Sequence, residues 1–414
     1  MAESYDYLLL GGGTSCGYAA AAIRSIDKDG SIGIISADSE PPYDRPPFSK
    51  NFLTNGDMQI SDAHAKEEDF YEKNDIDLML ETEVYSLKPS AQAVETRGGE
   101  LIHYGKLLYA LGSEPVRPPI DGADRINLLR TASNSKHIRS EAVSGKSAVV
   151  IGGGWIGVEV AASLRARGVN VELVELSDRV LPKLGSSECA KMVKMQLESL
   201  GAKLNLGQAV AAVEADGSVR TKSGDSIPAD FVVAGVGARP RLKMGIDAGL
   251  AKGEQGLLAD ATLLSSDPNI WIAGDDVEYP DPIMGHLFRA EHHLHAQWSG
   301  DHCGKCMAGE VSPYRKVPYF FSDIGDLSLI FRGDPDAKGR AFVLGSADGP
   351  SCTEIVLRDD GRMASFTDVR KDYSAQEPLT GMAEALIDKG ISLESQVSAM
   401  SDRAFDPAEL KSLL

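Results

Sequence analysis

Glycine residues at positions 11–13 and 152–154 are the residues whose type and spacing point most clearly to chemistry. Each run follows four apolar residues and precedes an apolar helical pattern, so each predicts a strand, a tight turn and a helix. In such a turn the first glycine permits the bend, the second lets the backbone approach a pyrophosphate, and the third lets helix and strand pack closely. The N-terminus of the helix then binds the anion. Two turns of this kind predict two dinucleotide-binding units in one chain.

The second turn has glycine at all three places, Gly152, Gly154 and Gly157. Glu175 follows at the end of the next predicted strand, where its carboxylate can accept a hydrogen bond from the ribose 2′-hydroxyl. Because a carboxylate at that place disfavours a 2′-phosphate, the sequence predicts NADH as the preferred nicotinamide. Arg179 lies close by in the sequence and leaves NADPH open as an alternative.

The first turn departs from the pattern at its third place. Gly11 and Gly13 are present, but Cys16 stands where the third glycine is expected, and we interpret it as a small packing residue. The matching ribose acid is Asp38, one place beyond the expected position, which Ala37 occupies. One such turn is weak evidence by itself, so the prediction depends on the two turns in series and on the strand endings that accompany them.

Buried strands must hold these turns in place. Apolar runs at 107–112 and 231–237 end in glycine and are followed by proline, and a third run ends in Gly274 and Asp275. Beyond Pro313 the glycine turns stop and the pattern becomes that of an α+β domain. The sequence therefore predicts an α/β fold with two Rossmann-like domains, the second inserted in the first, and a C-terminal α+β interface domain. The predicted boundaries are 1–118 with 246–312, then 119–245, and finally 313–414.

Composition narrows the classes of function. The 414 residues carry 42 basic and 61 acidic side chains, a net charge of −19, which disfavours nucleic acid and anionic lipid as partners. The uncharged stretch 7–23 is better explained by a strand, turn and helix than by a membrane span, and no leader is visible before it. Five scattered cysteines are too few for a disulfide framework, which favours a reducing, cytoplasmic location.

Three segments resemble a known family. The sequences at 42–50 (PYDRPPFSK), 289–296 (RAEHHLHA) and 318–323 (PYFFSD) are similar to segments of bacterial ferredoxin reductases, apoptosis-inducing factor and monodehydroascorbate reductases. The 289–296 segment resembles the first helix after the Gly-Asp motif in the latter two. The resemblance runs from Tyr5 to about Phe331. It implies FAD in the first domain, NAD(P)H in the inserted domain and an electron acceptor beyond them.

The resemblance also implies roles for single residues. Lys50 is expected near the flavin N5 and paired with Glu159, because a cation there stabilises reduced flavin and a carboxylate moderates its effect. The alternative is an ordinary surface lysine and a glutamate that interacts with a helix dipole. Arg45 is expected near the phosphates, and Asp275 is expected to accept from the ribityl or pyrophosphate side of the flavin.

The remaining expected contacts surround the two rings. Glu291 and His292 resemble the pair that faces the nicotinamide and the flavin edge, and Phe321 stands where relatives place Trp or Tyr against the flavin. The other residues expected to bind a cofactor, by their positions in the motifs, are Thr14, Gly112, Ile156 and Gly237.

Histidines and cysteines in the segment 286–306 suggest two further chemistries. His292 and His295 share a helical face, but a metal site needs a convergent set of ligands, so we expect none. Cys303 and Cys306 form a CxxC pattern, yet disulfide reductases of this superfamily carry their redox cysteines where this chain has 46–50. We therefore expect these two thiols to have no catalytic role.

The sequence predicts a FAD-dependent NAD(P)H oxidoreductase in which hydride passes from nicotinamide C4 to flavin N5. The acceptor is left open among a small iron–sulfur protein, a quinone or a radical such as monodehydroascorbate, and oxygen. The histidine-rich segment favours the branch of apoptosis-inducing factor and monodehydroascorbate reductase. The alternative is a redox-responsive scaffold or signalling flavoprotein whose NADH-reduced state changes its dimerisation. Formation of a homodimer is also left open.

Overall fold

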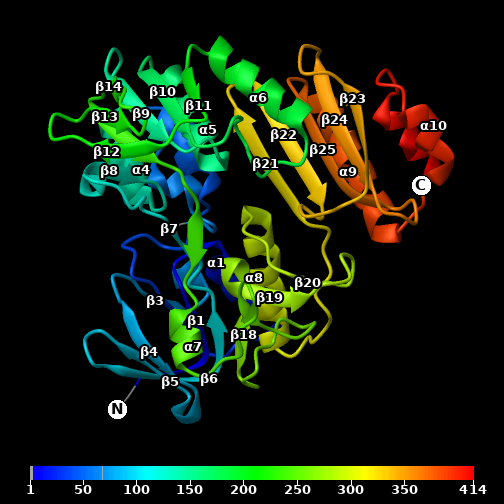
Figure 1. Cartoon of the computed structure of the whole chain (residues 1–414). Helices are drawn as coiled ribbons and strands as arrows, with labels where there is room; N and C mark the ends of the chain where they lie inside the picture. Colours follow the sequence, from blue (N-terminus) through cyan, green and yellow to red (C-terminus); the bar gives the residue numbers. More distant parts are fainter. Residues whose placement is uncertain (1–2, 68) are drawn as a thin grey trace. The chain divides into compact units, whose positions relative to one another are not determined.

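Each predicted glycine turn joins a buried parallel strand to a helix in the computed structural model of the chain (Figure 1). The structure describes residues 3–67 and 69–414, so Met1 and Ala2, with which the predicted first domain begins, and Glu68 lie outside it. The chain divides into two units, each made of three segments. The first unit comprises the chain up to Pro46, Gln59–Glu114 and Ala238–Lys316, and the second comprises Pro47–Met58, Pro115–Gly237 and Val317–Leu414.

The first unit is built on parallel strands in the order β3, β2, β1, β6, with β18 also pairing with β6. Leu8, Leu9 and Leu10 of β1 are fully buried, as expected of a parallel strand that is covered on both faces. Helix α1 leaves the first glycine turn and packs against α8, and the two lie side by side in Figure 1. The elements of this core are β1 (Glu3–Leu10), α1 (Thr14–Ile26), β2 (Ile32–Ile35), β3 (Ile76–Met79), β6 (Leu101–Tyr109), β18 (Ile270–Ile272) and α8 (His293–Met307).

Shorter elements complete the first unit. Strands β5 and β4 extend the sheet in antiparallel fashion from β6. The shorter elements are β4 (Val84–Lys88), β5 (Ala93–Thr96), α3 (Phe70–Lys73), β7 (Ser113–Pro115), β16 (Ala238–Pro240), α7 (Lys243–Asp247), β17 (Leu257–Leu258), β19 (Val277–Pro280) and β20 (Leu287–Phe288).

The second unit contains another parallel sheet, in the order β11, β10, β9, β15, β8. Buried valine and isoleucine side chains from β9, β10 and β15 form its core together with residues of a small antiparallel sheet, β12 to β14. The elements are α2 (Asn51–Thr54), β8 (Ile126–Leu128), α4 (Ala132–Glu141), β9 (Ser147–Ile151), α5 (Trp155–Ala166), β10 (Asn170–Glu175), α6 (Ser187–Ser199), β11 (Lys203–Leu206), β12 (Val210–Val213), β13 (Val219–Thr221), β14 (Ser226–Ile227) and β15 (Phe231–Ala234).

The last part of the second unit is an antiparallel sheet in the order β21, β22, β25, β24, β23, against which helix α9 packs. Aspartate 372 caps the start of α9 by accepting from the backbone N–H of Ser374, and Gly390 ends the helix in a left-handed conformation. The elements are β21 (Tyr319–Ile324), β22 (Leu327–Gly333), β23 (Arg340–Gly345), β24 (Ser351–Leu357), β25 (Met363–Arg370), α9 (Tyr373–Lys389) and α10 (Val397–Met400).

The predicted fold class is confirmed, because the chain contains two α/β dinucleotide-binding sheets and an antiparallel α+β part. The expected helix at 289–296 is wrong in its first half, since α8 begins only at His293. His292, just before it, has an extended backbone, and Arg289 Nη1 donates to the Asp275 carbonyl at 3.0 Å and to Glu291 at 2.8 Å. Within the described residues, none of the helices has both the length and the apolar character needed to cross a membrane.

Candidate active site

The second glycine turn lies between β9 and α5. Gly152 has a positive φ of 98°, and a Cβ on Gly157 would lie 1.9 Å from the carbonyl oxygen of Gly152, so packing requires both glycines. A Cβ on Gly154 would meet only the Gly235 carbonyl oxygen, at 3.7 Å, which is an ordinary contact. The packing of the protein therefore does not itself require glycine at 154. An open backbone at the N-terminus of α5 fits a pyrophosphate.

Two other expected residues lie in the same unit as this turn. Ile156, in the first turn of α5, is 39% exposed, which is unusual for an isoleucine beside a buried strand. Gly237 follows β15, has a φ of 115° and accepts from the backbone N–H of Val116 at 2.9 Å. Both therefore leave surface available near the end of the parallel sheet.

Glu175 ends β10 directly against the glycine turn. Its Oε2 accepts from the N–H of Gly153 at 2.5 Å and its Oε1 from the N–H of Ser177 at 2.7 Å. The side chain is buried, and these two backbone donors fix its orientation. A carboxylate held in this way still has lone pairs that can accept from a ribose hydroxyl.

The first glycine turn brings together four of the expected residues. A Cβ on Gly11 would meet the Ala110 carbonyl at 2.2 Å, and one on Gly13 would meet Nη1 of Arg45 at 3.2 Å. Thr14 begins α1, and its hydroxyl donates to Asp44 Oδ1 at 3.0 Å. The guanidinium of Arg45 beside the start of α1 gives this turn the positive charge and backbone donors that a diphosphate needs.

Cys16 is buried beneath the first turn, whereas Asp38 lies beside it. Cys16 is fully buried, and burial raises the pKa of its thiol, so it stays protonated and acts as a packing residue. Asp38 lies beside the turn, since its Cβ is 3.9 Å from the position that a Cβ on Gly12 would take. Its Oδ2 accepts from the hydroxyl of Tyr43 at 2.7 Å, which orients the carboxylate.

The Gly-Asp strand ending contains a residue that sequence reasoning missed. Gly274 has a φ of 71° and donates its N–H to the hydroxyl of Ser299 at 2.9 Å. The predicted acid, Asp275, is half-buried, whereas the neighbouring Asp276 is fully buried and accepts from the N–H of Gly112 at 2.6 Å. Asp276 thus ties the ends of β6 and β18 together. From the sequence alone, Asp275 and Asp276 are adjacent aspartates, and nothing indicates which of them is buried.

Lys50 and Glu159 meet within the second unit. Nζ of Lys50 lies 3.5 Å from Oε1 of Glu159, and the two side chains are 11% and 8% exposed. Lys50 is therefore no ordinary surface lysine. Nζ also lies 4.5 Å from the centroid of the Phe321 ring, so three expected residues from three segments of the chain form one cluster.

Two serines complete the surroundings of Glu159. The hydroxyl of Ser49 donates to Oε2 at 2.5 Å and that of Ser322 donates to Oε1 at 2.7 Å. Burial raises the pKa of the Glu159 carboxyl, while Lys50 and the two hydroxyls oppose that rise. The carboxylate is thus a buried group whose proton affinity depends directly on Lys50.

Asp323 and Tyr373 were not identified from the sequence. Oδ2 of Asp323 lies 3.0 Å from Nζ of Lys50, closer than Glu159 does, and Oδ1 accepts from the hydroxyl of Tyr373. Burial, followed by this hydrogen bond, raises the pKa of Tyr373 to about 12, so it stays protonated. Lys50 therefore interacts with two carboxylates. Asp323 lies in the segment 318–323 that carried the family resemblance, but nothing in its type distinguished it from a surface aspartate.

Glu291 and His292 lie in the first unit. Glu291 is exposed and pairs with Arg289, whereas His292 stands at the N-cap position of α8 without a capping hydrogen bond from its side chain. Burial lowers the pKa of His292 to about 4, as it does for His295, so both rings are neutral near pH 7. A neutral ring at 292 can act as one donor and one acceptor.

Both cysteines of the CxxC pattern are buried in α8. Burial raises the pKa of Cys303 and of Cys306, and all five cysteines of the chain are free thiols. We expect the variant with Ser at both positions to keep NADH-to-dye electron transfer within a few-fold of the parent. Steady-state assays with ferricyanide measure this. Reduction of glutathione disulfide by the parent would contradict it.

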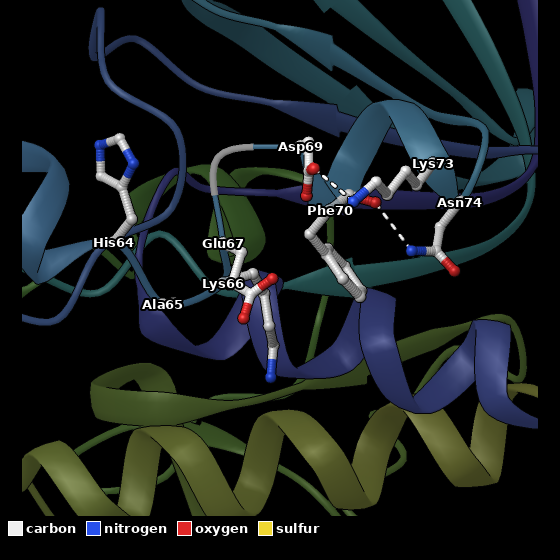
Figure 2. Close-up of a pocket in the computed structure, with 8 residues that line it drawn as sticks. All are labelled: His64, Ala65, Lys66, Glu67, Asp69, Phe70, Lys73 and Asn74. Carbon is white, nitrogen blue, oxygen red and sulfur yellow. Dashed lines mark hydrogen bonds and ion pairs between the residues drawn. The ribbon is translucent and has the colours of Figure 1, made fainter.

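An open pocket of about 500 Å³ lies elsewhere in the first unit (Figure 2). Lys66 points from it toward α1, where Nζ lies 3.9 Å from the ring centroid of Tyr18, and burial lowers the pKa of this amine. An exposed ion pair between Asp69 and Lys73 borders it. Among the described lining residues, 64–67, 69, 70, 73 and 74, there is none of the predicted site residues.

Comparison with known proteins decides the family. Residues 5–300 match the family model described as pyridine nucleotide-disulphide oxidoreductase. The chain belongs to this family. It is an oxidoreductase with FAD and NAD(P)H as its cofactors, which agrees with the two glycine turns.

Three relatives of this oxidoreductase are informative. A rubredoxin-NAD(+) reductase of Ectopseudomonas oleovorans is 30% identical over 78% of this chain and 85% of its own. A monodehydroascorbate reductase of Oryza sativa subsp. japonica is 28% identical over 78% of this chain and 70% of its own. The crystal structure of the ferredoxin reductase for the CYP199A2 system of Rhodopseudomonas palustris superposes with a TM-score of 0.87 at 26% identity, covering 98% of this chain and 99% of that one.

These relatives support the electron-transferring oxidoreductase over the alternative of a signalling scaffold. The preference for the branch of apoptosis-inducing factor and monodehydroascorbate reductase gains no support, because reductases of rubredoxin and ferredoxin match at least as well. Of the histidines that suggested it, the half-buried His292 and the buried His295 are neutral near pH 7.

Proposed function

We propose that the chain is an NADH-dependent reductase that passes electrons to a small iron–sulfur protein. The observation that carries this proposal is the cluster that buried Glu159 forms with Lys50 and the half-buried Asp323 in the unit that contains the complete glycine turn. Relatives named as rubredoxin and ferredoxin reductases support the choice of acceptor. Bound FAD supplies the conversion between two-electron and one-electron transfer that this reaction requires.

The residues divide the work of binding between the two turns. The turn with Gly152 and Gly154 holds the pyrophosphate of NADH, Gly157 lets α5 pack against this turn, and Glu175 accepts from the ribose. Around the first turn, the residues proposed to hold FAD are Gly11, Gly13, Thr14, Asp38, Arg45, Gly112, Gly274 and Asp275. With this division we propose 1–118 and 246–312 as the FAD-binding domain, 119–245 as the NADH-binding domain and 313–414 as the interface domain.

Lys50 supplies the positive charge of the site. It stabilises negative charge on the reduced cofactor, and Glu159 limits that stabilisation so that electrons can leave again. Ser49 and Ser322 hold the Glu159 carboxylate in place, while Asp323 keeps Nζ of Lys50 from pairing with Glu159 alone. Phe321 covers the amine with an aromatic face. For Glu291 and His292 we propose contacts with the nicotinamide.

The acceptor is tested by rapid mixing of the NADH-reduced protein with rubredoxin, a [2Fe–2S] ferredoxin, a quinone and monodehydroascorbate. We expect an iron–sulfur protein to reoxidise the flavin fastest. The monodehydroascorbate reductase relative makes the radical the second candidate. A protein that is reoxidised only slowly by all four would contradict the proposed function.

The net charge of −19 predicts that higher salt speeds the reaction with an acidic acceptor, because like charges are screened.

Glu175 provides a test of coenzyme choice. We expect the parent to be reduced at much lower concentrations of NADH than of NADPH, and we expect Glu175→Gln to narrow that gap, since the carboxylate repels a 2′-phosphate. Flavin bleaching titrated with each coenzyme measures both. The matched control is Glu172→Gln, which removes a carboxylate of the same strand, β10, that pairs with Lys203 of β11. Equal preference in the parent would show that Glu175 has only a structural role.

We also propose a reducing, cytoplasmic location, which the five free thiols support. Formation of a homodimer stays a prediction, and sedimentation of the holoprotein tests it.

A further inference from the structure

One face of the C-terminal sheet carries a cavity of about 320 Å³, at the lower end of the range for small-molecule sites. Alternate residues of β21 and β22 point to the same face, and helix α9 covers them. The helix contributes residues that recur at helical spacing. The lining residues are Tyr319, Phe321, Ser328, Ile330, Arg332, Tyr373, Gln376, Glu377, Thr380 and Gly381.

Arg332 is the unusual residue of this cavity. Its side chain is 8% exposed, and within the part of the chain that the structure describes, its Nε and Nη1 are buried without a hydrogen-bond partner. Only Nη2 is paired, at 2.8 Å from Oε2 of Glu384. Burial lowers the pKa of the guanidinium, and Glu384 opposes that shift, so the group stays charged. A buried cation with unsatisfied donors is costly unless something supplies an acceptor.

The walls of the cavity define the shape of that acceptor. The guanidinium carbon of Arg332 lies 3.9 Å from the ring centroid of Tyr319, its direct partner across the strand pair. Tyr319 and Phe321 stack with their ring centroids 6.2 Å apart, and Tyr373 lines the cavity from α9. Aromatic walls of this kind favour a planar ligand.

Charge restricts the ligand further. Glu377 lines the cavity and Glu384 already pairs with the guanidinium, so a second negative charge on the ligand would meet two carboxylates. A ligand with a single carboxylate places only one negative charge beside these two groups and can accept hydrogen bonds from the unpaired Nε and Nη1 of Arg332.

We propose that this cavity binds a small planar monocarboxylate, such as an aromatic acid, whose carboxylate accepts hydrogen bonds from Arg332 and whose ring lies against Tyr319. The cavity adjoins the cluster of Lys50, Glu159 and Asp323 within the second unit. Two of its lining residues make this contact, since Phe321 lies against Lys50 and Tyr373 donates to Asp323. A ligand bound in the cavity would therefore contact two residues that interact with Lys50 and Asp323.

Calorimetric titration of the holoprotein with benzoate tests the proposal without an activity assay. We expect binding with a Kd of about 1 mM or tighter, and no binding of the neutral isostere benzamide. Arg332→Met should weaken benzoate binding at least about tenfold, because the charge-assisted hydrogen bonds are lost. Arg340→Met is the matched control, since Arg340 is an exposed arginine of the same sheet that pairs with Glu394. It should bind benzoate as the parent does.

Glu384→Gln gives a second, independent result. Removing the competing carboxylate frees Nη2 and should tighten benzoate binding several-fold. This variant decides the question if Arg332→Met does not fold, as judged by circular dichroism and flavin content. Benzoate bound equally by parent and Arg332→Met, unchanged or weaker binding by Glu384→Gln, or no binding by the parent would each overturn the proposal.

Discussion

Gly154→Ala is expected to fold like the parent and to bind NADH about 10- to 100-fold more weakly, a loss of roughly 1.4 to 2.8 kcal/mol. The reason is the space around this residue. A Cβ at 154 meets only the Gly235 carbonyl, at 3.7 Å, and the φ of −74° suits alanine. The added methyl group therefore strains nothing in the protein but occupies the surface at the start of α5 where we place the pyrophosphate. Titration of flavin bleaching with NADH measures the change.

Gly157→Ala is the control, because it tests a glycine of the same turn that is required for packing. There a Cβ would lie 1.9 Å from the carbonyl oxygen of Gly152, so strand and helix would have to separate and the melting temperature should fall. If Gly154→Ala binds NADH as tightly as the parent, the second glycine turn does not form part of the coenzyme site.

Lys50→Ala is expected to slow flavin reduction by at least about tenfold even at saturating NADH. The variant loses the positive charge that stabilises the reduced flavin, so the effect falls on the chemical step and not on NADH binding. Its flavin potential should also fall. The pKa of Glu159, which burial already raises, should rise further once the opposing cation is gone, so the variant should hold a proton on this carboxyl at higher pH than the parent. Rapid-reaction traces across NADH concentrations give the rate, and infrared difference spectra of the carboxyl give its protonation.

Asp323→Asn provides the control for this second prediction. It removes the nearer carboxylate but keeps Lys50, so the amine should shift its pairing toward Glu159 and the flavin potential should move much less than in Lys50→Ala. Parental reduction kinetics in Lys50→Ala would show that Lys50 has only a structural role, in its contacts with Glu159, Asp323 and Phe321.

The glycine turns could be predicted from the sequence because their requirements are local. Gly152 and Gly157 touch one another within a single strand–turn–helix, so their spacing alone encodes the contact. The strand and helix that the sequence predicts around them, ending near Glu175, are present as α5 and β10. Local physics therefore defined the fold class and both dinucleotide-binding units.

The Lys50 cluster could not be predicted in this way. Lys50 and Glu159 are more than one hundred residues apart, and only the family resemblance suggested that they meet. The resemblance included Asp323 but implied no role for it, and it did not reach Tyr373. An aspartate in an alternating strand and a tyrosine at a helix start are both typical of surface positions. Arg332 is hidden for the same reason, because a charged residue in a strand is normally taken to face water.

The dodecapeptide Pro47–Met58 has a consequence for modularity. It belongs to the second unit although its neighbours on both sides belong to the first, and hydroxyls of Ser135 and Ser163 anchor it through the carbonyls of Phe48 and Ser49, at 2.6 and 2.8 Å. An excised fragment 115–237 would keep every glycine of its coenzyme turn and yet lose Ser49, Lys50 and Ser322, the partners of its buried glutamate. The fragment 115–237 is thus not an independent module. A chimaeric protein that contains it must also include Pro47–Met58 and β21.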